Sequence, residues 1–211
     1  MDHSHDPKTC CELDVPRYDV CQTVDEIGFI NGIWTAALEG DVDRVNRLLQ
    51  KGVHVDATDS AGYTALHYAT RGGHVRVCEV LLECGAKVDA RTRSMRATPL
   101  HRAASAGHVR VIELLLRHGA APNLMDADGR TALHRAIPPG SDEGAEIVER
   151  LLPITDRTIK DNHGRTVDDE FERWKATEGG DVEKILIRRI LRHTEKVETV
   201  STFPPTTSRS H

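Results

Sequence analysis

The sequence predicts an all-α solenoid, in which helical hairpins stack side by side. A Thr-x-Leu-His motif occurs at Thr64–His67, Thr98–His101 and Thr131–His134, so its copies are 34 and then 33 residues apart. A glycine recurs with the same period, at positions 52, 85 and 119. The segments between motifs carry apolar residues at i, i+3, i+6 and i+7, which is typical of a half-buried helix. Because one hairpin cannot bury such a stripe by itself, neighbouring hairpins must stack.

Each hairpin has recognisable helix boundaries. The motif threonine can cap the free N–H groups of an inner helix, and Pro99 occupies a first turn, where its missing N–H costs nothing. Gly73 and Gly107 can adopt the positive φ that ends one helix and turns the chain into the next. The outer helices follow, with apolar stripes within residues 42–49, 75–82, 109–116 and, less fully, 145–152.

The first and fifth units depart from the motif as capping units do. Gly32–Ala37 replaces the Thr-x-Leu-His start in the first unit. The fifth unit begins at Gly164 and places Arg188 and Arg189 at stripe positions, where a C-terminal cap needs a polar face. We therefore expect three to four full or near-full hairpins between an N-terminal and a C-terminal cap.

These units predict the organisation of the chain. We expect a flexible tail over residues 1–21, a repeat domain over residues 22–192 and a disordered Ser/Thr/Pro-rich tail over residues 193–211. Within the repeat domain, the units run over about 30–59, 60–92, 93–125 and 126–161, with the cap at 162–192.

The fourth unit carries an insertion of about three residues within the segment Pro138–Glu143. The Pro138-Pro139 pair stops a helix, so we expect the inner helix to end near Ile137. The insertion is either a partner-specific loop or a tolerated surface insertion.

Composition bounds the function and the compartment. The net charge of −5 and pI near 6.2 argue against binding nucleic acid or an anionic membrane through bulk electrostatics. No run approaches the roughly 18 apolar residues of a membrane span, and the N-terminus lacks a secretory apolar region. The five cysteines are not spaced as a disulfide framework, so we expect thiols and a cytoplasmic and/or nuclear protein.

With these motifs in place, residues from about Gly32 to Leu191 resemble the ankyrin-repeat family. The resemblance implies stacked hairpins, a turn before each motif threonine that is called a finger, and a concave groove that binds protein without a cofactor. It also implies that partner contacts come from the fingers and from the exposed positions of the inner helices.

On that implication we predict a partner-binding set of two tyrosines and five arginines: Tyr63, Tyr68, Arg71, Arg96, Arg102, Arg130 and Arg135. Arginine pairs with carboxylates and phosphates through two parallel hydrogen bonds, and both residue types are enriched at binding hot spots. Because acidic residues are expected mostly elsewhere, the set favours an acidic or phosphorylated segment of a protein partner. The alternative is that these arginines are scattered and solvated.

Other sites are disfavoured. His67, His101 and His134 recur once per repeat, and the resemblance implies that they tie adjacent fingers together rather than bind a metal. His3, His5, Cys10, Cys11 and Cys21 offer zinc-ligand chemistry, but their spacing is poor, so a flexible tail is expected there.

No catalytic motif occurs in the sequence, so no enzyme is expected. The resemblance implies one modification, because Asn123 lies where members of the family can be hydroxylated.

Two functions remain at this point. The first is a scaffold or adaptor that binds a protein partner through the groove and the fingers. The alternative is a regulatory or inhibitory subunit that occludes an enzyme or transcription factor by stoichiometric binding. In both cases we expect a monomer, because a capped stack leaves no open end.

Overall fold

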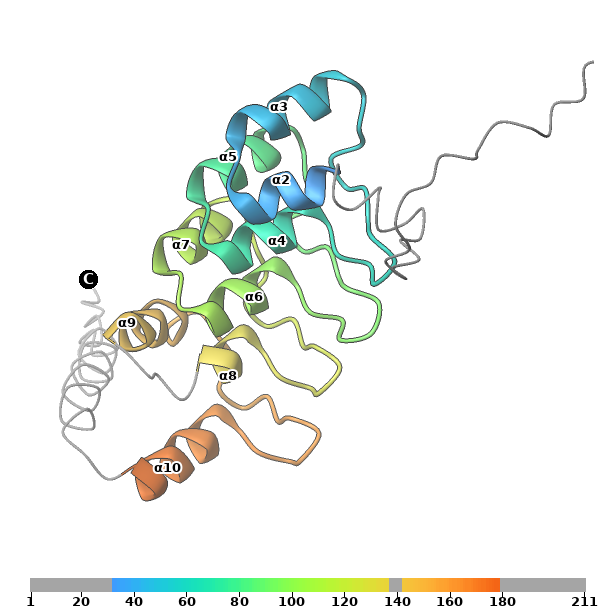
Figure 1. Ribbon diagram of the computed structural model, residues 1–211. Coiled ribbons are helices and arrows are strands. Elements are labelled where there is room, and N and C mark those ends of the chain that lie inside the picture. Colours follow the sequence, from blue (N-terminus) through green and yellow to red (C-terminus); the bar gives the residue numbers. More distant parts are fainter. Residues whose placement is uncertain (1–31, 137–141, 179–211) are drawn as a thin grey trace, which may run out of the picture.

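The computed structural model describes residues 32–136 and 142–178, and these form a row of stacked helical hairpins (Figure 1). The predictions for both tails, the N-terminal cysteines and histidines, the two prolines of the insertion and the second helix of the C-terminal cap fall outside the described residues. Within the described part, the all-α prediction is confirmed, because the only β pairing there is one isolated bridge between Thr58 and Thr64.

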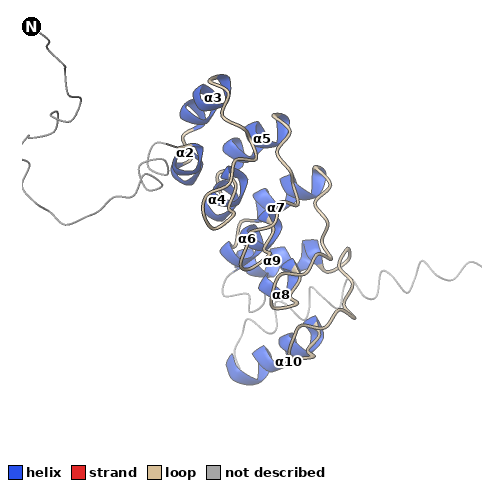
Figure 2. Ribbon diagram, turned by 90° about the vertical axis from the view of Figure 1, so that its right-hand side faces the viewer, coloured by secondary structure: helices blue, strands red, loops and turns tan. Residues whose placement is uncertain are grey.

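The helices form an inner and an outer row, which Figures 1 and 2 show from two sides. Each inner helix packs on the inner helix of the next unit, and each outer helix from α3 to α9 packs on the next outer helix. The fingers project together from the ends of the inner helices (Figure 1). The inner row consists of α2 (Ile33–Glu39), α4 (Ala65–Gly72), α6 (Pro99–Ala106), α8 (Ala132–Ala136) and α10 (Val167–Glu178). The outer row consists of α3 (Val42–Gln50), α5 (Val75–Glu83), α7 (Val109–Arg117) and α9 (Asp142–Leu151).

The inner helices begin and end where the sequence predicts. Thr64 and Thr98 are the N-cap residues of α4 and α6, each in an extended conformation. Gly73 and Gly107 end these helices in the left-handed conformation, with φ of +73° and +85°. At Gly73 a side chain would also be excluded by packing, because a Cβ would lie 2.7 Å from the His108 ring.

The core lies between the two rows and is wider than the predicted stripes. Cys78, Ile112 and Leu115 are buried as predicted, whereas Val75 and Val109 are only partly buried. The structure instead buries further outer-helix residues that the stripe pattern missed: Val77, Val111, Leu114 and Ile147. Helix α3, at the N-terminal end, fully buries only Val45, as a capping helix would.

The insertion in the fourth unit corrects one boundary. Helix α8 has five residues and ends at Ala136, next to the predicted Ile137. Helix α9 begins at Asp142, so Asp142 and Glu143 belong to the helix rather than to the loop. An acidic residue suits the first turn of a helix, where the backbone N–H groups have no partner within the helix and the macrodipole is positive.

Across the described part of the chain, no helix has the length and apolar character needed to cross a bilayer.

Candidate functional site

The fingers before Thr64, Thr131 and Thr166 share an aspartate that shapes the turn. In the fourth unit, Oδ1 of Asp126 accepts hydrogen bonds from the backbone N–H groups of Asp128 (2.9 Å) and Arg130 (3.0 Å). Asp59 and Asp161 hold their fingers by the same pair of bonds, to the residues two and four positions later. Sequence reasoning missed these aspartates, although each lies five residues before its threonine. They make the fingers rigid turns that present their side chains at fixed positions.

Fingers are numbered by the repeat unit that they begin, so the third finger is the turn before Thr98. It is built differently from the others. Thr92 occupies the position of the aspartate, and the finger is one residue longer, with six rather than five steps to its threonine. Arg96 lies two residues before that threonine and has φ of +49°, whereas Gly62 and Gly129 take the left-handed conformation at the same position in their fingers. A side chain in this conformation costs about 1–2 kcal/mol. The third finger therefore carries an arginine where the local backbone favours glycine.

Two of the three motif histidines, His67 and His101, connect successive fingers by a hydrogen bond. The Nε2 atom of the third, His134, is buried and has no hydrogen-bond partner among the described residues. Nδ1 of His67 accepts a hydrogen bond from the backbone N–H of Thr64 (3.1 Å), so the ring proton must be on Nε2. Nε2 donates to the carbonyl oxygen of Ala97, in the next finger, at 3.1 Å. His101 repeats the arrangement, with Nε2 donating to the carbonyl of Arg130 at 2.9 Å. One neutral tautomer is thus required at each of these positions.

Burial keeps these histidines neutral. It lowers the pKa of His67 from 6.5 to about 4, although the carbonyl of Ala97 acts in the opposite direction. Burial also lowers the pKa of His101 and of His134, against the effect of the Arg130 and Arg165 carbonyls. In residues 32–136 and 142–178, no three His, Cys, Asp or Glu side chains are grouped to hold a metal ion.

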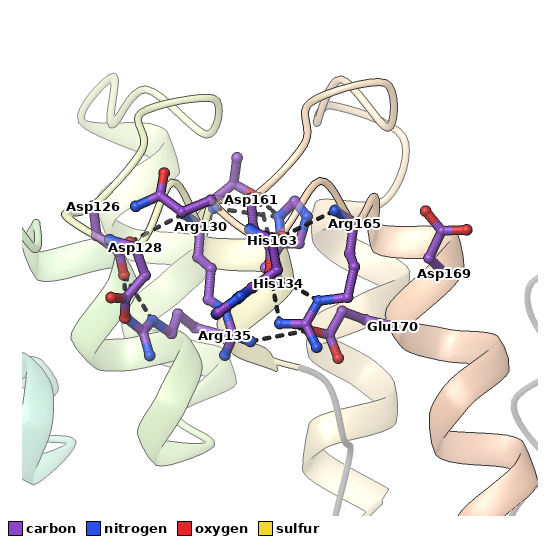
Figure 3. Close-up of polar contacts among 12 residues, drawn as sticks. Asp126, Asp128, Arg130, His134, Arg135, Asp161, His163, Arg165, Asp169 and Glu170 are labelled. Atoms are coloured by element: carbon purple, nitrogen blue, oxygen red, sulfur yellow. Dashed lines mark hydrogen bonds and ion pairs between the residues drawn. The ribbon is translucent and has the colours of Figure 1, made fainter.

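At the C-terminal end of the groove, the predicted arginines pair with carboxylates (Figure 3). Nε of Arg135 donates to Oδ2 of Asp126 at 2.7 Å, and its Nη2 donates to Asp128 at 2.7 Å. The Asp126 side chain is 1% exposed and that of Arg135 is 24% exposed. Burial disfavours the charge on Arg135, but the hydrogen bonds that it donates to Asp126 and Asp128 raise its pKa above the ordinary value.

Arg130 belongs to a second group of charges, which reaches α10. Its Nη2 donates to Glu170 on α10 at 2.9 Å, and its Nε lies 3.7 Å from Asp161. Arg165 bonds the same two carboxylates, at 2.8 Å to Asp161 and 3.0 Å to Glu170. Burial tends to raise the pKa of Asp161, but Arg165 and backbone N–H groups hold it far below its usual range. Figure 3 shows these side chains between the fourth and fifth fingers.

At the middle of the groove, the arginine lies on an aromatic ring instead. The Arg102 guanidinium carbon is 4.8 Å from the centroid of the Tyr63 ring, and its Nη2 contacts the Tyr63 hydroxyl. The rings of Tyr63 and Tyr68 lie 5.5 Å apart. The Tyr68 hydroxyl donates to Asp59 at 2.7 Å, and burial together with this bond raises the pKa of Tyr68 above its usual range.

The structure therefore divides the predicted set into two groups. Arg130 and Arg135 form ion pairs, so the expectation that acidic residues lie mostly elsewhere is wrong for this end of the groove. Among the described residues, no carboxylate lies within ion-pair distance of the other three arginines: Arg71, Arg96 and Arg102. Arg71 and Arg96 are exposed and Arg102 is partly buried. Within the predicted set, the arginines without an ion pair among the described residues thus belong to the second and third units.

Asn123 has a structural contact of its own. Its Oδ1 accepts a hydrogen bond from the backbone N–H of Asp156 at 2.8 Å. Asp56 and Asp89, one repeat apart, make the same contact with the backbone of the following unit. The side chain at this position therefore links neighbouring repeats.

On the other side of the stack, a surface hollow of about 570 Å³ lies beside α7 and α9. Arg150 lines it and pairs with Glu113 at 3.0 Å and with Glu146 at 3.3 Å. The two carboxylates that line the hollow are thus both paired with Arg150.

Comparison with known proteins agrees with this architecture. One family model, described as ankyrin repeats (many copies), matches residues 33–82, and another, described as ankyrin repeats (3 copies), matches residues 89–163. Ankyrin repeat domain-containing protein 39 of Homo sapiens is 54% identical over 83 residues, which are 39% of this chain and 45% of that protein. The Bos taurus protein of the same name is 55% identical over 65 residues, or 31% of this chain and 36% of that protein.

A third relative is an enzyme by name. Palmitoyltransferase akr1 of Schizosaccharomyces pombe is 48% identical over 109 residues, which are 51% of this chain but 17% of that protein. The chain thus matches less than half the length of each of these three relatives. The two family matches, the stacked hairpins and the repeated Thr-x-Leu-His motif lead to one conclusion: the chain belongs to the ankyrin-repeat family.

Proposed function

We propose that this chain is a non-catalytic scaffold or adaptor, which binds a protein partner through the inner-helix face and the fingers. Ankyrin repeats imply protein–protein interaction. The observation that carries the proposal is the contrast between the two sides of an inner helix. On α6, Ala103 and Ala104 are buried in the stack, whereas Ser105 is exposed and Arg102 is partly exposed. The second side has polar groups that suit contact with another protein.

The partner contributes an acidic or phosphorylated segment. Arg71, Arg96 and Arg102 supply positive charge without a carboxylate within ion-pair distance in the described part of the chain. Tyr63 and Tyr68 place aromatic surface beside them. This combination of arginine and tyrosine is characteristic of energetically important contacts in protein interfaces.

A non-catalytic role is supported by how little of palmitoyltransferase akr1 this chain matches. The similarity to palmitoyltransferase akr1 covers only 17% of that protein, and the family models that match this chain describe ankyrin repeats. We also propose a location in the cytoplasm and/or the nucleus, which is supported by the free thiols of Cys78 and Cys84.

Affinity purification with quantitative mass spectrometry tests this proposal. We would compare the wild-type chain with Ser105→Trp, which adds bulk to the groove face, and with Arg117→Trp, which adds the same bulk to an exposed position on the outer helix α7. The expected result is a protein that is recovered with the wild type and with Arg117→Trp but is depleted with Ser105→Trp. Equal recovery by all three would contradict binding through the groove face.

A further inference from the structure

We propose that the groove recognises a phosphorylated side chain of its partner, and that the third repeat unit, with Arg102 at its centre, is where the phosphate binds. This inference rests on the proposed function, because it specifies the partner class and the contact point on the same face. Three independent features of the third unit support it: its charge pattern, the state of Arg102 and the conformation of Arg96.

The charge pattern of the third unit differs from that of its neighbours. Residues 90–108, which precede the outer helix of this unit, contain four arginines and no aspartate or glutamate: Arg91, Arg93, Arg96 and Arg102. The finger aspartate of the other units is replaced here by Thr92. In the fourth unit, by contrast, Asp126 and Asp128 neutralise the arginine that corresponds to Arg102, namely Arg135. The loss of the finger aspartate therefore leaves Arg102 without the internal partner that Arg135 has.

Arg102 is held in place by Tyr63, but no described carboxylate forms an ion pair with it. Its guanidinium lies over the Tyr63 ring, which fixes the orientation through cation–π attraction. Its Nε is buried and has no hydrogen-bond acceptor among the described residues. The nearby carboxylate of Asp59 is occupied by the Tyr68 hydroxyl and by two backbone N–H groups. A fixed guanidinium with spare positive charge is preorganised to bind an oxyanion.

Arg96 adds a second exposed guanidinium at a position that disfavours any side chain. It occupies the left-handed position that Gly62 and Gly129 occupy in their fingers. Residues in strained conformations concentrate at functional sites, where the surrounding structure holds them. Arg71, exposed at the end of α4, supplies a further positive charge on the groove face.

The number of arginines favours phosphate over a single carboxylate. A phosphorylated serine or threonine carries about −1.5 to −2 charges and three acceptor oxygens, so that it can bond more than one guanidinium. A carboxylate carries one charge and is saturated by one bidentate arginine. The excess of arginines in the third unit therefore matches the more highly charged group. Arginine also suits phosphate better than lysine does at a fixed site, because its planar fork fits two oxygens.

The test uses the full chain and three degenerate peptide pools, in which the central residue is phosphoserine, glutamate or serine. We expect the wild type to retain the phosphoserine pool at least tenfold more than the serine pool and clearly more than the glutamate pool. Arg102→Gln should lose most of this preference. Arg117→Gln, which removes an equal charge from an exposed outer-helix position, should retain it.

A second variant separates binding from folding. Arg96→Gly removes a guanidinium while relieving the strained conformation, so it should weaken retention of the phosphoserine pool without destabilising the fold. Circular dichroism would show whether Arg102→Gln is folded. If that variant does not fold, the paired variant Arg71→Gln with Arg96→Gly provides the test, because both side chains are exposed.

Four results would overturn the inference. These are equal retention of the phosphoserine and serine pools, preference for the glutamate pool, unchanged retention by folded Arg102→Gln, and displacement of the phosphopeptides by a random single-stranded oligonucleotide at lower concentration. None of them would refute the proposed function as long as Ser105→Trp still depletes a protein partner. Loss of that depletion, with phosphopeptide retention intact, would instead refute the groove-face partner alone.

Discussion

The Nε2 atom of His67 donates to the carbonyl oxygen of Ala97, 3.1 Å away in the next finger, while the Nδ1 atom of the same neutral ring accepts a hydrogen bond from the backbone N–H of Thr64. The Nδ1 atom is already an acceptor for the backbone N–H of Thr64, so a proton placed there would replace an attraction by a repulsion. The environment of this buried ring thus favours its neutral form, because a charged ring would be desolvated and would lose the bond from Thr64.

Because the folded protein favours the neutral form of His67, its stability should depend on pH. The folded-state pKa of His67 is about 4 against 6.5 for an exposed histidine, so the unfolded chain binds more protons between these values. The stabilisation is therefore fully present above pH 6.5 and is lost as the pH falls toward 4. His67 alone contributes about 3 kcal/mol over this range, and His101 and His134 change in the same direction.

Urea unfolding at several pH values measures this effect. The free energy of unfolding of the wild type should decrease from pH 6.5 to pH 4, and His67→Gln should show a shallower slope. The exposed His163 provides the control, because His163→Gln should leave the slope unchanged. Parallel curves for the wild type and His67→Gln would contradict the assignment.

A second prediction concerns Arg96, which has a positive φ. Arg96→Gly should raise the free energy of unfolding by about 0.5–1 kcal/mol, because relief of the left-handed conformation outweighs the greater entropy of glycine in the unfolded chain. Arg91→Gly, at a position without a positive φ, should lower stability instead. The midpoints of urea unfolding distinguish the two, and a lower midpoint for Arg96→Gly would be evidence against the strain.

Two glycines with the same backbone conformation provide a third prediction. Gly119 has φ of +83° and open space around it, whereas a Cβ at Gly129 would lie 2.9 Å from the backbone nitrogen of Asn162. Gly119→Ala should cost about 1 kcal/mol from backbone strain alone. Gly129→Ala should cost at least about 1 kcal/mol more, because the fourth and fifth fingers must separate. Thermal unfolding of the two variants measures the difference, and equal losses would show that the fingers do not pack as described.

Two carboxylates that share one arginine provide a fourth prediction. Asp126 and Asp128 both bond Arg135, but their side chains are 1% and 50% exposed. Asp126→Asn should cost about 3 kcal/mol, because it removes the charge of a fully buried carboxylate that binds Arg135 and disturbs two backbone N–H bonds. Asp128→Asn should cost less than about 1 kcal/mol, as exposed ion pairs do. Chemical unfolding of both variants decides this, and similar costs would indicate that burial of Asp126 is not what matters.

Much of the fold could be predicted from the sequence because its determinants are local. The motif threonines and the glycines at 73 and 107 fix the ends of the inner helices through capping and positive φ, which do not depend on distant residues. The i, i+3, i+6, i+7 pattern missed Val77 and Val111, because neighbouring units cover an outer helix on more than one stripe. The start of α9 at Asp142 was missed because the prolines and glycine just before it favour a turn, whereas acidic residues also suit the first turn of a helix.

The candidate site was less accessible, because its pairings join different repeats. Arg130 and Glu170 are 40 residues apart, and nothing local in the sequence shows that α10 brings Glu170 to the fourth finger. Arg135 and Asp126 belong to one repeat, but the bond depends on how the finger folds back on its helix. Aligning the repeats would have shown that Thr92 and Arg96 replace the usual aspartate and glycine, since that comparison needs only the sequence. The partner-binding set itself stays a prediction.

Site-specific photocross-linking would show directly whether a protein partner binds the groove face. It reports contact without removing any groove side chain that we assign to binding. A photoreactive amino acid would be placed in the cell at position 105 on the groove face, or at position 117 on the outer helix. We predict covalent adducts with a protein partner from position 105 and none from position 117. Adducts from position 117 without adducts from position 105 would show that the partner binds another face and would contradict the account.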